Sequence, residues 1–326
     1  IIGEDEQSVH NQLELFGFDQ LLAIAEGRLT GAALKQERRR IAAAHASMSD
    51  LSMDDVAFLH AGLCQTGLPH SRPVRNDEPW QRSNGRFHLV VEPGTVIDQA
   101  SGKSKWVGVP YGTKARLIFM HVSTEGIKSR QVHLGRSMSA WMRRLGLSVS
   151  GGEHGTIAPI KEQTLRLGRA RFSFQFETEG GGLGISDTQI ADKLHFWATE
   201  DGPWLEEIEL TDRFHEHLRE HAVPLSDHAI SYLSGSSLKL DLYAWAAWRL
   251  PRLGRPLRLN WTQIAATFAA AGDINKVAAK VREALPDVQT VYRDMKIETT
   301  RGGLILHPSK PPVPKTLVMV GGKAGG

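Results

Sequence analysis

Three helices followed by a β-hairpin are predicted twice along this chain of 326 residues, and this repeated order constrains its fold more than any other feature. The first set places helices at 113–128, 137–147 and 156–170, and its hairpin joins RFSFQFE at 171–177 to DKLHFWAT at 192–199. The second set places helices at 238–253 and 274–288, a short strand that leads into a helix within 258–272, and its hairpin at 291–309. Phe172, Phe174 and Phe176 alternate with polar residues, as in a half-buried strand. Both sets have the order of a winged helix.

We therefore expect an α+β protein with two tandem winged-helix DNA-binding domains and an N-terminal helical segment. The expected parts are N-terminal helices at 1–62, a first winged-helix domain with a strand-rich start at 63–210, a bridging helix or linker at 211–236, a second winged-helix domain at 237–308 and a flexible tail at 309–326. In the first part, Leu13, Phe16 and Leu21 share a helical face, Gly27 ends that helix, and 53–63 forms a further short helix. These apolar residues need a covering surface, either in their own domain or in a homodimer.

Charge is distributed in blocks along the chain, although the formal net charge is only +3. Residues 112–171 contain eleven Lys and Arg against three acids, and residues 237–315 contain thirteen against six. Between them, residues 177–220 contain twelve acids against three bases. The two basic blocks coincide with the two predicted winged helices, which favours DNA contacts over a chance fluctuation of charge.

The first candidate recognition helix covers 157–170. Ile157, Ile160, Leu165 and Leu167 are expected to face inward, which leaves the polar residues Lys161, Gln163, Thr164 and Arg166 to face the DNA. Further cations of this block are expected near the DNA backbone, with Arg143 and Arg144 on the preceding helix and Arg169 and Arg171 at the start of the wing; the others are Lys114, Arg116, Lys128, Arg130 and Arg136. A single one of these residues could equally solvate a helix surface, so the prediction depends on their clustering.

The second candidate recognition helix runs from Asn275 to Leu285. Val277, Val281 and Leu285 recur at a spacing of four and are expected to face inward. The residues left outside are Lys276, Ala279, Lys280, Arg282 and Glu283, and the wing is expected to carry Arg293 and Arg301. The alanines would permit close approach to a groove, although a tightly packed helix would use them as well.

Two catalytic alternatives rest on histidines near residue 217. HLREH at 217–221 matches the His-x-x-Glu-His spelling of a zinc peptidase family. The inner stripe of Leu210, Phe214 and Leu218 leaves these histidines near solvent, so this zinc site is a remote alternative. HEH at 215–217 resembles weakly the His pair of rolling-circle nucleases, with Tyr292 as the nucleophile, and is less favoured still. The chain has no phosphate-binding loop, so we expect no enzyme activity, no cofactor and no metal.

The single cysteine, Cys64, excludes intrachain disulfides, and no run of about 18 apolar residues is present for a membrane span. The N-terminus lacks the pattern of a secretory signal. We expect a cytoplasmic protein without a membrane partner. Because the chain begins with Ile1, the sequence leaves open whether residues precede it.

Seven blocks of the chain resemble the plasmid-encoded RepA replication initiators. They are LCQTGLPH at 63–70, GVPYGTKARLIFMHVSTEGIKS at 108–129, LGRSMSAWMRRLGL at 134–147, KEQTLRL at 161–167, EHAVPLSDHAI at 220–230, LDLYAWAAWRL at 240–250 and GGLILHPSKPPV at 302–313. The resemblance implies a DNA-binding protein that recognises direct repeats in double-stranded DNA at a plasmid origin. It also implies help in opening the origin and recruitment of host initiator and helicase-loading proteins. An autoregulatory transcriptional repressor with the same fold stays open as an alternative.

Overall fold

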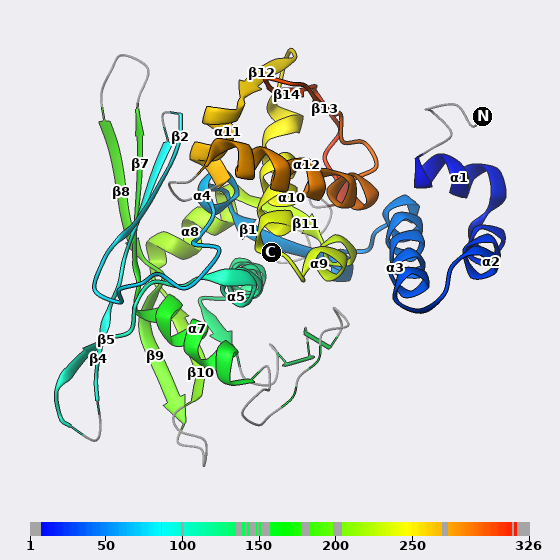
Figure 1. The fold of residues 1–326 in the computed structure, drawn as a ribbon. Helices are drawn as coiled ribbons and strands as arrows, with labels where there is room; N and C mark the ends of the chain where they lie inside the picture. Colours follow the sequence, from blue (N-terminus) through cyan, green and yellow to red (C-terminus); the bar gives the residue numbers. More distant parts are fainter. Residues whose placement is uncertain are drawn as a thin grey trace.

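The fold is described by a computed structural model for residues 8–85, 87–98, 101–134, 139–140, 142–143, 148, 150, 157–177, 183–197, 204–268, 273–314 and 316–317 (Figure 1). Helices and small antiparallel sheets surround one large hydrophobic core, and the N-terminal helices form a second, smaller core. The predicted α+β class is confirmed to the extent that helices and sheets are mixed. Within the described ranges, no helix combines the length and the apolar character that crossing a membrane requires.

The N-terminal segment consists of α1 (Val9–Phe16), α2 (Phe18–Arg28) and α3 (Gly31–Met48). Leu13 and Leu21 are buried in their own small core, as the helical pattern predicts, whereas Phe16 remains 45% exposed. The predicted single helix is divided because Gly17, with φ of 75°, ends α1, and α2 then continues through Gly27 to Arg28. The segment contacts the rest of the fold mainly through α3, which packs against α9 (Asp227–Leu233) and α12 (Ile274–Val291).

The predicted helix at 53–63 is wrong. This segment forms the short helix η2 (Met53–Asp55), strand β1 (Val56–His60) and the start of α4 (Ala61–Thr66). Strand β1 pairs with β11 (Ala222–Ser226), and all five of its residues are buried. A strand that is covered on both faces shows no alternation, so periodicity cannot separate it from a buried helix. Val313, in the predicted flexible tail, is fully buried against Val56 and Phe58, so the tail is attached to the fold at this point.

A four-stranded sheet has the order β2-β3-β7-β8, and a separate two-stranded ribbon, β4–β5, follows β3. Their bounds are β2 (Trp80–Asn84), β3 (Phe87–Glu92), β4 (Thr95–Ile97), β5 (Ser104–Trp106), β7 (Arg171–Glu177) and β8 (Leu183–Gln189). The alternating strand at 171–177 is confirmed, and Phe172 and Phe174 are buried. The prediction that this strand pairs with 192–199 in a hairpin is wrong, because β7 pairs with β3 and β8.

The first helical unit has its own small sheet, and β7 and β8 are inserted in its sequence between α7 and β9. The elements of the unit are α5 (Gly112–Lys128), β6 (Gln131–His133), α7 (Ile157–Arg169), β9 (Ala191–Trp197) and β10 (Trp204–Leu210), followed by α8 (Asp212–His221). Residues 139–140 and 142–143 are also helical. The sheet order is β6-β10-β9, so the hairpin of this unit is β9–β10.

The second helical unit has the same sheet order, β12-β14-β13, with the first strand next to the third. Its elements are α10 (Ser237–Arg249), η3 (Leu250–Arg252), β12 (Leu257–Asn260), α11 (Trp261–Phe268), α12, β13 (Ile297–Thr299) and β14 (Gly303–Leu306). The predicted order of helices and hairpin is confirmed for this unit. Gly303, the first residue of β14, lies so close to the end of β12 that an added Cβ would be 1.9 Å from the carbonyl oxygen of Leu259.

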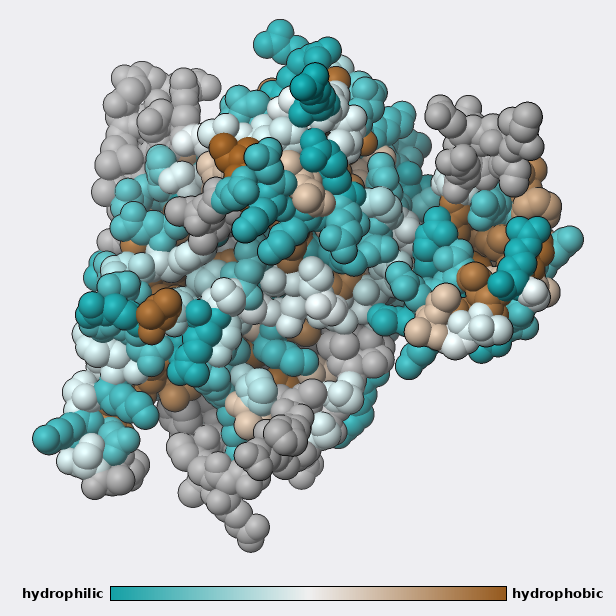
Figure 2. Space-filling model, viewed as in Figure 1, coloured by the Kyte–Doolittle hydropathy of each residue, from teal (hydrophilic) through white to brown (hydrophobic). Residues whose placement is uncertain are grey.

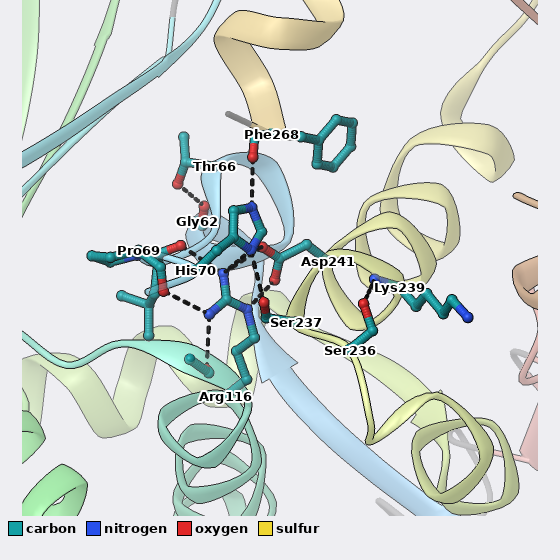
Figure 3. A network of polar contacts seen from close by, with 12 residues as sticks. Gly62, Thr66, Pro69, His70, Arg116, Ser236, Ser237, Lys239, Asp241 and Phe268 are labelled. Carbon is teal, nitrogen blue, oxygen red and sulfur yellow. Dashed lines mark hydrogen bonds and ion pairs between the residues drawn. The ribbon is translucent and has the colours of Figure 1, made fainter. Parts of the chain in front are cut away.

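A buried ion pair joins the two units through their first helices (Figure 3). Arg116 on α5 donates from Nε and Nη2 to the two carboxylate oxygens of Asp241 on α10, at 2.6 and 2.5 Å. The remaining donors of Arg116 reach the backbone carbonyls of Leu68, Pro69 and Gly112 at 2.6, 3.1 and 2.9 Å. Arg116 is only 4% exposed, so its prediction as a DNA contact is wrong: its guanidinium is saturated inside the protein.

His70 extends this network to the second unit. Its Nε2 lies 2.5 Å from the carbonyl oxygen of Phe268, and its Nδ1 lies 2.9 Å from the hydroxyl of Ser237. Because a carbonyl only accepts, Nε2 carries the proton, and a neutral ring then accepts from Ser237 at Nδ1. Burial lowers the pKa of His70, which favours this neutral form.

Replacing Arg116 with methionine is expected to destabilise the fold by about 3–5 kcal/mol, because Asp241 then remains buried without a counter-ion. The shift in the urea midpoint measures this loss. Arg38→Ala serves as the control, since Arg38 forms an ion pair with Glu26 at the surface, where such pairs contribute little. Equal midpoints for the two variants would show that the buried pair does not hold the units together.

Candidate DNA interface

The basic residues of the first unit are largely used inside the fold, and Arg166 is the clearest case. It is 2% exposed, donates to Glu162 Oε1 at 2.9 Å and to the carbonyl of Val109 at 3.2 Å, and lies over the ring of Tyr111 at 5.1 Å. Its Nη2 also donates to Asn76 at 3.2 Å. The prediction that Arg166 faces outward is therefore wrong.

Gln163 and Thr164 are buried as well, which corrects their predicted orientation on α7. Gln163 Oε1 accepts from the backbone N–H of Tyr111 at 2.8 Å, and Thr164 donates to the carbonyl of Ile160 at 2.7 Å. With Ile160 and Leu167 they occupy positions i, i+3, i+4 and i+7, which form one helical face. The predicted inner residues Ile157 and Leu165 are only half-buried, because two polar residues with satisfied hydrogen bonds take the inner positions.

Arg130 is occupied by the acidic stretch of the chain. Its guanidinium donates to the carbonyl of Leu210 at 3.0 Å and forms ion pairs with Asp192, Asp212 and Glu209 at 3.0, 2.8 and 3.5 Å. These carboxylates come from β9, β10 and α8, so part of the acidic block neutralises the first basic block within the protein. This arrangement contradicts the prediction of Arg130 as a DNA contact.

The other predicted cations of the first block lie in varied surroundings. Lys128 is exposed and pairs with Glu125 at 3.0 Å, and Lys114 is half-buried, which lowers its pKa. Lys161 is half-buried, and Arg143 and Arg171 are exposed. Arg169 donates to the carbonyl of Thr95 at 2.9 Å. The predicted position of Arg169 and Arg171 in a wing is wrong, because both lead into β7, and Arg136 and Arg144 lie outside the described residues.

In the second unit, α12 has the two faces that the sequence predicts. Val281 and Leu285 are buried and Val277 is half-buried, whereas the outer residues Lys276, Ala279, Lys280, Arg282 and Glu283 are all exposed. Asp273 caps the helix by accepting from the N–H of Asn275 at 2.9 Å. The first half of α12 therefore presents three cations and a small side chain to solvent.

Trp261 connects α12 to the β13–β14 hairpin. The guanidinium of Arg282 lies 4.4 Å from the Trp261 ring, and the indole N–H donates to the carbonyl of Arg301 at 3.0 Å. Arg301 is exposed at the turn of the hairpin, as expected of a wing residue. The predicted wing position of Arg293 is wrong: it lies between α12 and β13 and forms an ion pair with Glu14 of α1.

Sequence reasoning missed a row of arginines from the end of α10 to β12, namely Arg249, Arg252, Arg255 and Arg258. Arg249 and Arg252 lie over the ring of Trp248 at 5.6 and 5.3 Å. Among the described residues, none of the four forms an ion pair with a carboxylate, unlike Arg116, Arg130 and Arg166. The regular spacing of three was visible in the sequence and could have indicated this cluster.

His217 and His221 of the catalytic alternatives line a cavity of about 370 Å³ together with His60, Phe174 and Trp248, whereas His215 hydrogen-bonds to the carbonyl of Gly126. The rings of His60, His217 and His221 pack in series, with centroids 4.3 and 4.7 Å apart. In the part of the chain that the structure describes, no three His, Cys, Asp or Glu residues are arranged to hold a metal ion. Tyr292 is buried and donates to the carbonyl of Lys310 at 2.7 Å, which does not suit an accessible nucleophile.

Two solved structures of RctB domains 2 and 3 are similar to this chain. One is 12% identical, with a TM-score of 0.44, and the match covers 75% of this chain and 94% of that chain. The other, of selenomethionine derivatives, is 11% identical, with a TM-score of 0.49, and covers 76% and 96%. No curated protein matches the chain.

A family of plasmid-encoded RepA proteins matches the middle of the chain, from residue 109, just before α5, to residue 266 in α11. The matched part contains the first unit, the Arg116–Asp241 pair and the start of the second unit. Residues 109–266 of this chain match the plasmid-encoded RepA protein family, which supports a replication initiator of that family.

Proposed function

We propose that this chain is a plasmid replication initiator that binds repeated double-stranded DNA sites at the origin and helps to open them for the host machinery. Its family supports the initiator role. The observation that carries the DNA contact is the exposed face of α12, where Lys276, Lys280 and Arg282 lie without a carboxylate partner among the described residues. No catalytic step by the chain itself belongs to this proposal.

The second unit would bind as a winged helix. Helices α11 and α12 would form the helix-turn-helix, α12 would enter the major groove, and the β13–β14 hairpin would be the wing. This reading is supported by the sheet order β12-β14-β13 and by the capped, solvent-facing start of α12. Ala279 would allow close approach, and Arg301 would reach the adjacent phosphates from the wing.

The first unit would be a second winged helix of a different kind. Its sheet order β6-β10-β9 supports the same topology, with β7 and β8 inserted before the hairpin. Its α7 has polar residues turned inward, so we assign base reading to α12 and leave the first unit to contact the backbone. Arg143 and Arg171 are exposed in positions that permit such contacts.

The proposed function is tested on a supercoiled plasmid that carries the DNA around the gene for this chain. Footprinting is expected to show protected direct repeats, and permanganate is expected to modify unpaired thymines beside them when the protein is added. Protection without thymine modification would contradict origin opening and favour the repressor. Absence of protection at low salt would contradict DNA binding by this chain.

Replacing Lys276 and Lys280 together with alanine is expected to weaken binding to all sequences, because two phosphate contacts are lost. The slope of log K against log salt should become shallower by about 2, since each phosphate contributes about 0.9. A matched control removes Lys35 and Arg39, two exposed cations on α3 that lie outside the proposed recognition helix. A variant slope equal to that of the control would remove these lysines from the interface.

Arg282→Lys is expected to change base preference at one position of the site, by about 1–3 kcal/mol, because lysine keeps the charge but lacks the paired donors of arginine. Selection of bound sequences from a random pool measures the preference. The salt slope should stay unchanged in this variant. An unaltered sequence profile would show that Arg282 contacts phosphate or only Trp261.

A further inference from the structure

A two-stranded ribbon, β4–β5, projects from the body of the protein, and within the described residues it pairs with no other strand (Figure 1). Residues 101–106 are all exposed, and so is Ile97 at 62%; Trp106 is exposed at 47%. Figure 2 shows this ribbon as a mostly hydrophilic arm at the lower left. An isolated ribbon of two strands is marginally stable in water, so it needs anchoring at its base.

The base of the ribbon is anchored to the last turn of α7. The backbone N–H of Val107 donates to the carbonyl of Gly94 at 3.0 Å and closes the ribbon. A Cβ on Gly94 would lie 2.2 Å from the carbonyl oxygen of Arg169, whose side chain donates to Thr95. Gly108, with φ of +83°, leaves space for the guanidinium of Arg166, which a Cβ would approach to 2.1 Å. Arg166 and Arg169 therefore hold the ribbon in position.

The pairing of the two strands gives the ribbon two different faces. Thr95 pairs with Trp106, and Ile97 pairs with Ser104, so Ile97 and Trp106 share a face. Val96 pairs with Lys105, and Lys103 lies two residues before Lys105 on that opposite face. The acid of the ribbon, Asp98, has its carboxylate turned into the loop, where it accepts two hydrogen bonds from Ser101 at 2.9 Å.

We propose that the β4–β5 ribbon is an additional contact with duplex DNA. Lys103 and Lys105 lie against phosphates, and Ile97 and Trp106 pack against the wall of the adjacent groove. A ribbon with exposed apolar side chains on one face and cations on the other can press against a groove wall with the first face while the second neutralises phosphates. The exposed Arg171 near the same end of α7 extends the basic surface. This inference rests on the proposed DNA binding.

The test compares two variants of the full chain on the DNA site that the wild-type protein protects. Lys103→Ala with Lys105→Ala is expected to make the salt slope shallower by about 2 and to remove hydroxyl-radical protection at one edge of the site. Trp106→Ala is expected to weaken binding about tenfold and to leave the salt slope unchanged, because the lost contact is apolar. The control is the variant that lacks Lys35 and Arg39.

The outcomes separate the ribbon from the proposed function. If the wild-type chain protects no DNA, the proposed function fails and the ribbon proposal fails with it. If the wild-type footprint is normal and both ribbon variants reproduce its edges, affinity and slope, only the ribbon proposal is overturned, and its apolar face then belongs to a protein partner. Circular dichroism checks that each variant is folded; the substituted side chains are exposed, so folding is expected to be unaffected.

Discussion

The ion pair between Arg116 and Asp241 is the contact on which the arrangement of the two units depends. It connects the first helix of one unit to the first helix of the other, and it also binds the carbonyls of the segment that leads from α4 toward α5. Charges removed from water are costly unless every donor and acceptor is satisfied, and here five donor contacts of one guanidinium are satisfied within the fold. Gly67 contributes by omitting a side chain: a Cβ there would lie 2.6 Å from Asp241.

Ion pairing separates two groups among the arginines described above. Arg116, Arg130 and Arg166 are turned inward and paired with carboxylates, so they organise the first unit and its neighbours. The four arginines from the end of α10 to β12, and Arg282 on α12, have no such partner among the described residues, and three of these five contact indole rings instead. An unpaired surface guanidinium retains its full attraction for phosphate. The two basic blocks thus differ in which cations are paired: in the first, Arg116, Arg130 and Arg166 are neutralised, whereas in the second Lys239 and Arg293 are paired and the other arginines named above are not, among the described residues.

Sequence patterns predicted α12 well and α7 poorly, for a physical reason. The inner residues of α12 are apolar at a spacing of four, so hydrophobic burial alone sets its orientation. On α7 the inner positions include Gln163, Thr164 and Arg166, whose burial depends on partners from distant segments, such as Tyr111 and Val109. The same limit applies to strands: alternation identified β7, but its pairing with β3 joins residues about eighty to ninety positions apart. The family resemblance was not affected by these errors of orientation and pairing, because it rested on matching sequence blocks.

The buried ion pair between Arg116 and Asp241 also fixes the distance between the two helical units. A free linker would let each unit find its own DNA segment, at the expense of chain entropy for every contact made. Here helices packed around an ion pair set the separation between α12 and the elements attached to α7. A duplex that contacts both must match that separation. If its twist or length does not match, the DNA has to deform, because the protein cannot adjust. Sequences that bend or untwist easily would then be favoured at positions that no side chain reaches.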